Sequence, residues 1–135
     1  MRHGLSDADR GASAVEFALV APLFFVFLFL LIEGARVQWT QQIVQEVAGN
    51  TARCMAIGTT ACADGAAITA YARARGRSWG VVMDPATVDS AANQMCHGVT
   101  AMNRVTIRLP YRALTGLLPD APAVVTATAC YPSVL

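Results

Sequence analysis

Glu16 is the residue whose position needs a chemical explanation, because it stands just before the longest uncharged run of the chain, Phe17 to Ile32. A carboxylate near the centre of a bilayer costs about 2.5–3.5 kcal/mol, so one at the head of an apolar helix is a functional candidate. The simpler alternative places Glu16 at the membrane interface. There the positive end of the helix and a side chain that reaches toward water lower the cost.

Cysteines are the second group of reactive residues, and all four follow the apolar run: Cys54, Cys62, Cys96 and Cys130. An even number of cysteines in a small domain outside the cytoplasm predicts two disulfides. His97 adjoins Cys96, but the chain has no C-x-x-C pair and only one other histidine, His3. Without a closely spaced pair of ligands a zinc site is not favoured, and we expect neither a metal nor a cofactor.

No catalytic motif is found in the sequence, which has no G-x-S-x-G, no H-E-x-x-H and no phosphate-binding loop. We therefore do not expect an enzyme. The formal net charge of +1 gives no reason to expect nucleic acid as a partner. The one basic cluster, Arg73, Arg75 and Arg77, is interpreted as a solvated helix face, with a contact to anionic phosphate or polysaccharide as the alternative.

The apolar run defines the first structural element. Extended back to Ala12 it covers 21 residues, or about 31 Å of helix, which matches a hydrocarbon core of about 30 Å. A short N-terminal tail should stay in the cytoplasm, so we predict a transmembrane anchor at 12–33 and an extracytoplasmic domain at 34–135. The alternative is a cleaved secretory signal, but the residues around Ala35 do not form an Ala-x-Ala site.

The helical pattern continues after the apolar run. Six residues recur at three- and four-residue steps: Val37, Thr40, Val44, Val47, Thr51 and Cys54. This spacing predicts one packed face on a helix that continues from Ala12 to about Ile57 and stops at Gly58. A second helix, about Gly65 to Arg77, is predicted to begin after a cap at Asp64.

The rest of the chain has the two-residue period of strands. Val105, Ile107 and Leu109 alternate with polar residues, and a β-rich run through Val124 follows a turn-rich loop. These segments predict an antiparallel pair, extended to three strands by the weaker segment 86–93. The predicted fold class is therefore α+β: a long transmembrane helix that continues into a small domain with a second helix and a sheet of two or three strands.

Four cysteines allow three pairings, and the sequence does not exclude any of them. The last predicted strand returns alongside the preceding one, which brings Cys130 near Cys96. We therefore favour the pairs Cys54–Cys62 and Cys96–Cys130.

Glu16 belongs to a longer motif. Gly11 stands five positions before it, so the apolar run is headed by G-x-x-x-x-E-F. This arrangement resembles the processing site of type IV pilins and pseudopilins, and a glutamate followed by an aromatic residue is the form of the Flp pilus group. Residues 10–58 resemble the opening of TadE-like proteins of the tight-adherence (Flp pilus) system at Arg10-Gly11, Glu16-Phe17-Ala18-Leu19, Pro22, Glu33-Gly34 and Ala52-Arg53. Beyond residue 58 the likeness is only architectural.

The resemblance implies that a prepilin peptidase cuts between Gly11 and Ala12, which makes residues 1–11 a cytoplasmic leader. Glu16 would then pair with the new α-amino group of a neighbouring subunit. The implied fold is pilin-like, and the implied function is that of a minor pseudopilin or assembly component in the bacterial inner membrane. The implied partners are the prepilin peptidase, other pilin and pseudopilin subunits (a TadF-like protein and the Flp major pilin), the inner-membrane pilus platform and membrane lipid.

Two other functions stay open at this point. One is an unprocessed, signal-anchored extracytoplasmic binding domain that is unrelated to pili. The other is a secreted protein released near Ala35. The mature N-terminus distinguishes the three, because it would be Ala12, the intact start of the chain, or a residue near Arg36. The sequence does not decide whether a pseudopilin of this kind enters the filament, caps it or stays in the membrane platform.

Overall fold

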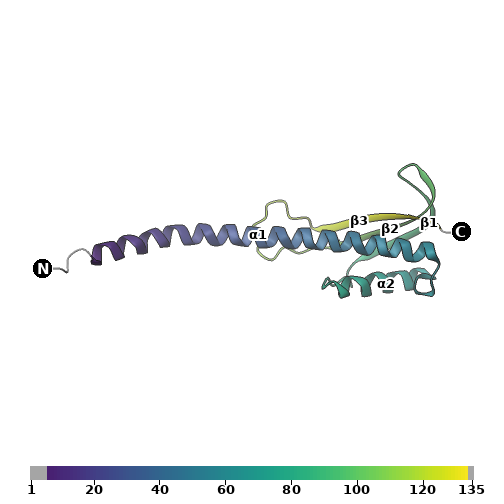
Figure 1. The fold of residues 1–135 in the computed structure, drawn as a ribbon, viewed down its shortest axis with the longest axis horizontal. Coiled ribbons are helices and arrows are strands. Elements are labelled where there is room, and N and C mark those ends of the chain that lie inside the picture. Colours follow the sequence, from purple (N-terminus) through teal and green to yellow (C-terminus); the bar gives the residue numbers. More distant parts are fainter. Residues whose placement is uncertain (1–5, 134–135) are drawn as a thin grey trace.

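The computed structural model describes residues 6–133, with side chains from residue 11 onward. The elements follow in the order α1 (Ser6–Ile57), a short 3-10 helix (Thr60–Cys62), α2 (Gly65–Ser78), β1 (Thr87–Cys96), β2 (Val99–Pro110) and β3 (Val124–Pro132). The N-terminal half of α1 projects alone from a head that contains every other element (Figure 1). The predicted α+β fold with a long N-terminal helix is confirmed.

Helix α1 continues without interruption through Pro22 and past the predicted end of the anchor. It ends at Gly58, whose φ of 69° is left-handed and whose N–H donates to the carbonyl of Met55 at 3.1 Å. A glycine adopts this conformation without the strain that a Cβ would bring. The helix begins at Ser6, six residues before the predicted start at Ala12, because a single interior glycine such as Gly11 costs only about 1 kcal/mol. The first five residues of the expected leader lie outside the described residues.

The predicted packed face of α1 is confirmed. Val44, Val47 and Thr51 are fully buried, and the two valines pack in one cluster with strand residues such as Val105 and Ile107. Burial of each aliphatic side chain of this size contributes about 1.5–3 kcal/mol. Thr51 satisfies its hydroxyl inside the core by donating to the carbonyl of Val47 at 2.7 Å. The stripe is wider than predicted, because Ile43, Ala48 and Ala52 are also buried.

The three strands form one antiparallel sheet in the order β1-β2-β3. Strand β1 is longer than the predicted segment 86–93, since it extends to Cys96 and turns directly into β2. His97 and Gly98 make this turn with φ angles of 49° and 81°, and two positive φ angles are typical of a type I′ hairpin turn. The role of His97 in the structure is thus a backbone role at an exposed turn.

The free edge of β3 is covered by glutamines from α1. Gln41 Nε2 donates to the carbonyl of Thr126 at 3.0 Å, and Gln45 Nε2 donates to that of Thr128 at 3.1 Å. Unpaired carbonyls on an edge strand are templates for pairing with another chain. Because the two glutamines occupy these carbonyls, α1 closes this edge as well as the buried face of the sheet.

Helix α2 runs back along the C-terminal half of α1 (Figure 1). Its start is the predicted one, since Asp64 Oδ1 accepts from the N–H of Ala67 at 2.8 Å. It ends in a Schellman motif, in which Val81 donates to the carbonyl of Gly76 at 3.0 Å and Gly80 has a φ of 78°. Gly76 is also required for packing, because a Cβ there would lie 2.1 Å from the sulfur of Met83.

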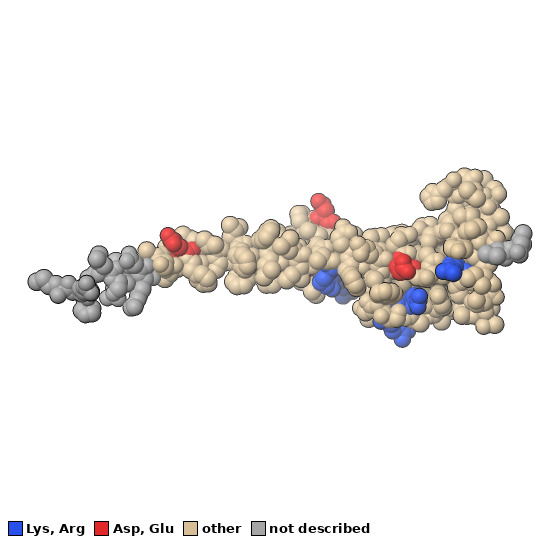
Figure 2. Space-filling view, viewed as in Figure 1, with Lys and Arg blue, Asp and Glu red and all other residues tan. Residues whose placement is uncertain are grey.

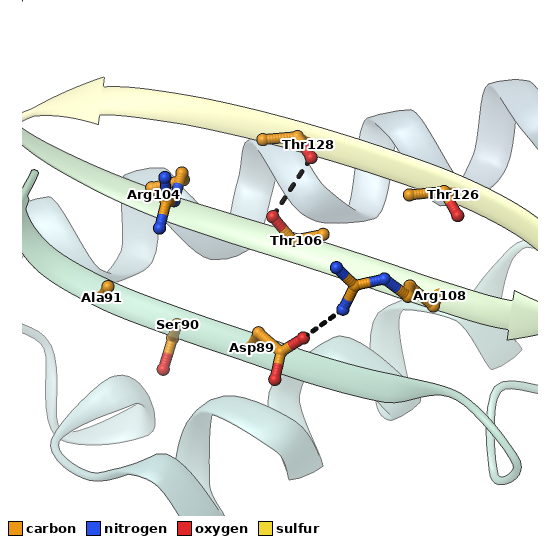
Figure 3. A pocket seen from close by; sticks show the side chains of 8 residues that line it. All are labelled: Asp89, Ser90, Ala91, Arg104, Thr106, Arg108, Thr126 and Thr128. Carbon is orange, nitrogen blue, oxygen red and sulfur yellow. Dashed lines mark hydrogen bonds and ion pairs between the residues drawn. The ribbon is translucent and has the colours of Figure 1, made fainter. Parts of the chain in front are cut away.

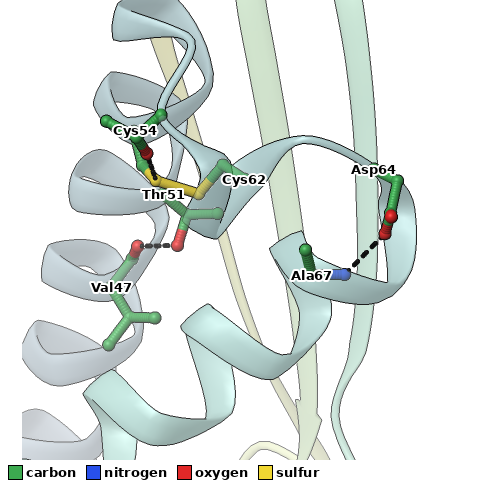
Figure 4. The surroundings of a disulfide bond; sticks show 7 residues. Val47, Thr51, Cys54, Cys62, Asp64 and Ala67 are labelled. Carbon is green, nitrogen blue, oxygen red and sulfur yellow. Dashed lines mark hydrogen bonds between the residues drawn. A yellow bond between two sulfur atoms is a disulfide. The ribbon is translucent and has the colours of Figure 1, made fainter.

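The structure contains the two disulfides that the sequence favoured, Cys54–Cys62 and Cys96–Cys130. The first joins the end of α1 to the 3-10 helix, where the Thr59 hydroxyl lies 3.1 Å from Cys54 Sγ (Figure 4). The second joins the end of β1 to β3. Both therefore lie at the end of the head that is farthest from the projecting half of α1 (Figure 1).

Removal of either disulfide should lower the free energy of unfolding of the head, and the size of this decrease should differ between the two disulfides. In the chain-entropy account, the bridge with 34 residues of separation contributes about 3.8 kcal/mol and the bridge with eight contributes about 2.6 kcal/mol. We expect the pair Cys96→Ser and Cys130→Ser to lower the free energy of unfolding more than Cys54→Ser and Cys62→Ser. Urea denaturation of the full chain in detergent, followed by circular dichroism, measures this. The reverse order would show that native-state contacts around the bridges outweigh loop length.

Candidate functional site

The N-terminal half of α1 is exposed and apolar. Within the described residues one helix is long and apolar enough to cross a membrane, and it is this one, over Gly11–Ile57. No part of its most apolar stretch is buried by the head, and Phe17, for example, is 73% exposed. In the space-filling view this rod carries acidic atoms near its start and no further charge until it reaches the head (Figure 2). This surface is consistent with a membrane anchor.

The residues of the predicted processing motif lie together at the start of this rod. Gly11, Ala12, Glu16 and Phe17 are all exposed and all helical. Glu16 makes no hydrogen bond or ion pair with the described residues. The head is far along the helix, so it contributes no side chain to this group. Among the described side chains, the motif is therefore an exposed surface without contacts to the head.

A second acidic residue of α1, Glu33, is buried instead. It directly follows the apolar run and is 1% exposed, because the loop between β2 and β3 closes over it. Oε2 accepts from the backbone N–H of Leu114 at 3.0 Å and of Thr115 at 3.2 Å. Oε1 accepts from the Tyr111 hydroxyl at 3.0 Å. Hydrogen bonds to an ionised carboxylate are the stronger kind, so these contacts fix the loop on the helix.

Arg36 completes the Glu33 contact from the next turn of α1. Its Nη1 lies 3.8 Å from Glu33 Oε1, and its guanidinium carbon lies 5.9 Å from the centre of the Tyr111 ring. Burial raises the pKa of the Tyr111 phenol above its usual range, the hydrogen bond to Glu33 raises it further, and the charge of Arg36 opposes both. Tyr111 therefore stays a neutral hydrogen-bond donor to the carboxylate at physiological pH.

Sequence reasoning noticed Glu33 only as part of a family resemblance and gave it no role. Its donors are 78 to 82 residues away along the chain, so no local pattern announces them. The available signal was the placement of an acidic residue directly after an apolar run, with Arg36 three positions later. That signal indicates a charged residue pair at the end of the apolar run, but it does not predict that the loop between β2 and β3 binds Glu33.

Hollows lie on the surface of the head, and two of them adjoin the Glu33 contact and the outer face of the sheet. One, of about 300 Å³, is next to the Glu33 contact and is lined by Arg36, Trp39, Tyr111 and Arg112 among others. The other, of about 500 Å³, is an open depression on the outer face of the sheet. There Arg108 pairs with Asp89 and the hydroxyls of Thr106 and Thr128 lie 3.1 Å apart (Figure 3).

The other side chains singled out in the sequence are dispersed. Arg77 pairs with Asp84 at 3.4 Å, Arg75 is exposed and Arg73 is half-buried, so the basic cluster of α2 forms no single surface. Arg75 and Arg77 lie in the last turn of α2, where positive charge complements the helix dipole. Among residues 6–133 no group of three or more His, Cys, Asp or Glu side chains is placed to hold a metal ion.

The family model described as TadE-like protein matches residues 11–53. This segment is similar to TadE-like proteins. It begins at Gly11 and includes Glu16, Phe17 and Glu33, and the resemblance found in the sequence is thereby shown. The likeness relates the chain to the tight-adherence pilus system in general. No curated protein and no solved structure matches the chain.

The TadE-like segment coincides with most of α1. It covers the exposed apolar half and most of the stripe that packs in the head, and it ends one residue before Cys54. All three strands and the loop that binds Glu33 lie outside it. The segment therefore carries one partner of the Glu33 contact, while the other partner lies outside the matched residues.

Replacement of Glu33 tests whether it holds the loop. Glu33→Ala removes the acceptor of two loop amides, so we expect hydrogen exchange at Leu114 and Thr115 to become about tenfold faster or more. Amide exchange of the full chain in detergent, read by mass spectrometry, measures it. Glu46→Ala is the matched control, because Glu46 is exposed on the same helix and bonds only to Asn50. Equal exchange in both variants would show that the loop is held by other contacts.

Proposed function

We propose that the chain is a minor pseudopilin or assembly component of a tight-adherence (Flp-type) pilus, anchored in the bacterial inner membrane by α1. In this proposal a prepilin peptidase cuts after Gly11, the N-terminus faces the cytoplasm and the head lies outside it. The protein acts through contacts and not through catalysis. Its partners are the peptidase, the Flp major pilin, a TadF-like subunit and the platform in the inner membrane.

One observation carries this proposal. The G-x-x-x-x-E-F motif stands at the head of an exposed apolar helix, inside the segment that matches the TadE-like family. A helix that projects free of its own head has its whole surface available for other helices and for lipid. The head then presents a separate surface outside the membrane, as expected of a subunit that is assembled through its anchor.

Cleavage after Gly11 requires a local conformational change. Gly11 and Ala12 lie inside α1, five residues after its start, and a peptidase needs access to the peptide bond between them. The first turns of a helix open at low cost, and a glycine lowers that cost further. The proposal therefore includes fraying of α1 up to about Ala12 when the peptidase engages it.

Glu16 gains a partner only after cleavage. The cut creates a positively charged amine at Ala12, and the exposed Glu16 of a neighbouring subunit is an acceptor of opposite charge. In a low dielectric, removal of one partner of a buried ion pair costs about 3–5 kcal/mol, because the other charge is left unpaired. Such a pair would select the axial register between subunits.

The alternative is an unprocessed, anchored binding domain. The depression on the outer face of the sheet favours it, because Arg104, Arg108 and several threonine hydroxyls converge there on an exposed surface (Figure 3). The continuity of α1 through Gly11 also fits a chain that keeps its N-terminus.

The mature N-terminus decides between these two functions. We expect a start at Ala12 in cells with their prepilin peptidase and the uncleaved chain in cells without it. N-terminal sequencing of the membrane-extracted protein measures this. A Gly11→Ala variant gives a control in the first strain, since loss of the glycine should slow cleavage without changing the anchor. An intact leader in both strains would contradict processing and favour the binding domain.

Replacement of Glu16 tests the proposed pairing. Glu16→Ala should leave cleavage after Gly11 unchanged and should lower the number of assembled pili by more than about tenfold, given the cost of an unpaired amine. Electron microscopy of sheared filaments and immunoblotting of the membrane fraction are the measurements. Glu46→Ala, on the head half of the same helix, is the control for a lost acidic residue. Unchanged pili and protein level would refute a role for Glu16 in assembly.

A further inference from the structure

The loop that binds Glu33 is held at the level where the apolar run ends. The backbone N–H groups of Leu114 and Thr115 lie 3.0 and 3.2 Å from Glu33 Oε2, and Glu33 directly follows Ile32, the last residue of that run. In Figure 1 the trace between β2 and β3 extends past the sheet toward the projecting half of α1. The lipid or water that surrounds the end of the anchor therefore also surrounds this loop.

The loop exposes leucine side chains at this level. Leu114 is 71% exposed and Leu117 is 43% exposed, although the backbone next to them is fixed to the helix. These two leucine side chains are therefore not part of the hydrophobic core of the head. Leu31 and Ile32, at the end of the apolar run of α1, are also exposed.

The hollow beside the loop is basic and has an aromatic wall. Arg36 and Arg112 line it together with Trp39, which is 53% exposed. Arg36 Nη1 is buried and makes no hydrogen bond, but it lies 3.8 Å from Glu33 Oε1 in an ion pair. Arg112 is exposed and makes no hydrogen bond or ion pair with the described residues. The hollow therefore offers the guanidinium of Arg112 to an anionic ligand, with the positive charge of Arg36 beside it. Arg with Trp is a pairing suited to a membrane–water interface.

We propose that the β2–β3 loop and this hollow form the membrane-facing surface of the head. Leu114 and Leu117 enter the interfacial layer of the bilayer, and Arg36 and Arg112 bind the phosphate of an anionic phospholipid. The occupant of the surface is thus the lipid bilayer that surrounds the anchor.

The axial distances agree with this placement. Each headgroup layer is about 5–8 Å thick, from a total bilayer thickness of about 40–45 Å around a core of about 30 Å. Arg36 lies four residues beyond Ile32, about 6 Å along the helix, and Trp39 lies about 10 Å beyond it. Side chains on a helix lean toward its N-terminus, which here is toward the bilayer. Asp120, the one acidic residue of the loop, is exposed and restricts the loop to headgroup depth.

This inference goes beyond the proposed function. It requires that α1 spans a bilayer, but it requires neither cleavage after Gly11 nor a pilus. It can therefore be tested on the purified, unprocessed chain in lipid vesicles, where failure of the proposed processing has no effect on the result.

The first experiment measures the depth of the loop. A tryptophan replaces Leu117 in a chain whose Trp39 and Trp79 are changed to phenylalanine, and the protein is reconstituted in phosphatidylcholine brominated near the headgroup. We expect the Leu117→Trp emission to be blue-shifted and largely quenched. Val99→Trp in the same background is the control, because Val99 is as exposed but lies at the distal hairpin. Equal emission from both reporters would overturn the proposal and leave a protein partner as the occupant of the leucines.

The second experiment tests the lipid phosphate contact. The chain with Trp79→Phe keeps Trp39 as a reporter in the hollow, and brominated phosphatidylglycerol is titrated into phosphatidylcholine vesicles. We expect Arg112→Gln to reduce the enrichment of anionic lipid at Trp39 about fivefold, the effect of one arginine near a membrane surface. Arg104→Gln, on the outer face of the sheet, should leave the enrichment unchanged. The proposal is wrong if the two variants behave alike, or if Trp39 reports no enrichment in the unsubstituted chain.

Discussion

The hydrogen bonds that Glu33 accepts from the β2–β3 loop determine where the head meets its anchor. A buried carboxylate is tolerated only when its oxygens are supplied with donors, and here the donors are two backbone amides and a tyrosine hydroxyl. Because these donors belong to the loop between two strands, the whole sheet is held in one axial position on α1. The core packing further along the helix holds the same sheet against α1, so the two sets of contacts fix one arrangement together.

The two ends of the head are held by different chemistry. The end near the anchor is joined by hydrogen bonds and an ion pair around Glu33, while the distal end is joined by two disulfides. Between them the core consists of aliphatic side chains from one stripe of α1 and one face of the sheet. The glutamines at positions 41 and 45 cover the outer edge of β3, which leaves the head without an exposed partner strand on that side.

Much of this structure was predictable from local patterns. The packed stripe of α1 was predicted from its three- and four-residue spacing. The alternation of Val105, Ile107 and Leu109 correctly predicted which face of β2 is buried. The cap at Asp64 and the helix end at Gly58 follow from the chemistry of single side chains. The predictions were wrong about the boundaries of two elements. Strand β1 continues to Cys96 because it pairs with β2, and α1 begins before Gly11 because one glycine does not stop a helix.

The candidate sites divide in the same way. The sequence by itself determined the motif around Gly11 and Glu16, the length of the apolar rod and the number of cysteines, because each depends on residues close together in the chain. Only the tertiary structure decided that Glu33 is buried, that Arg36 and Arg112 line one hollow, and that two leucines of a loop lie level with the end of the apolar run. Those arrangements join residues about 80 positions apart, and their energies come from burial and hydrogen bonding that exist only once the sheet has packed on the helix.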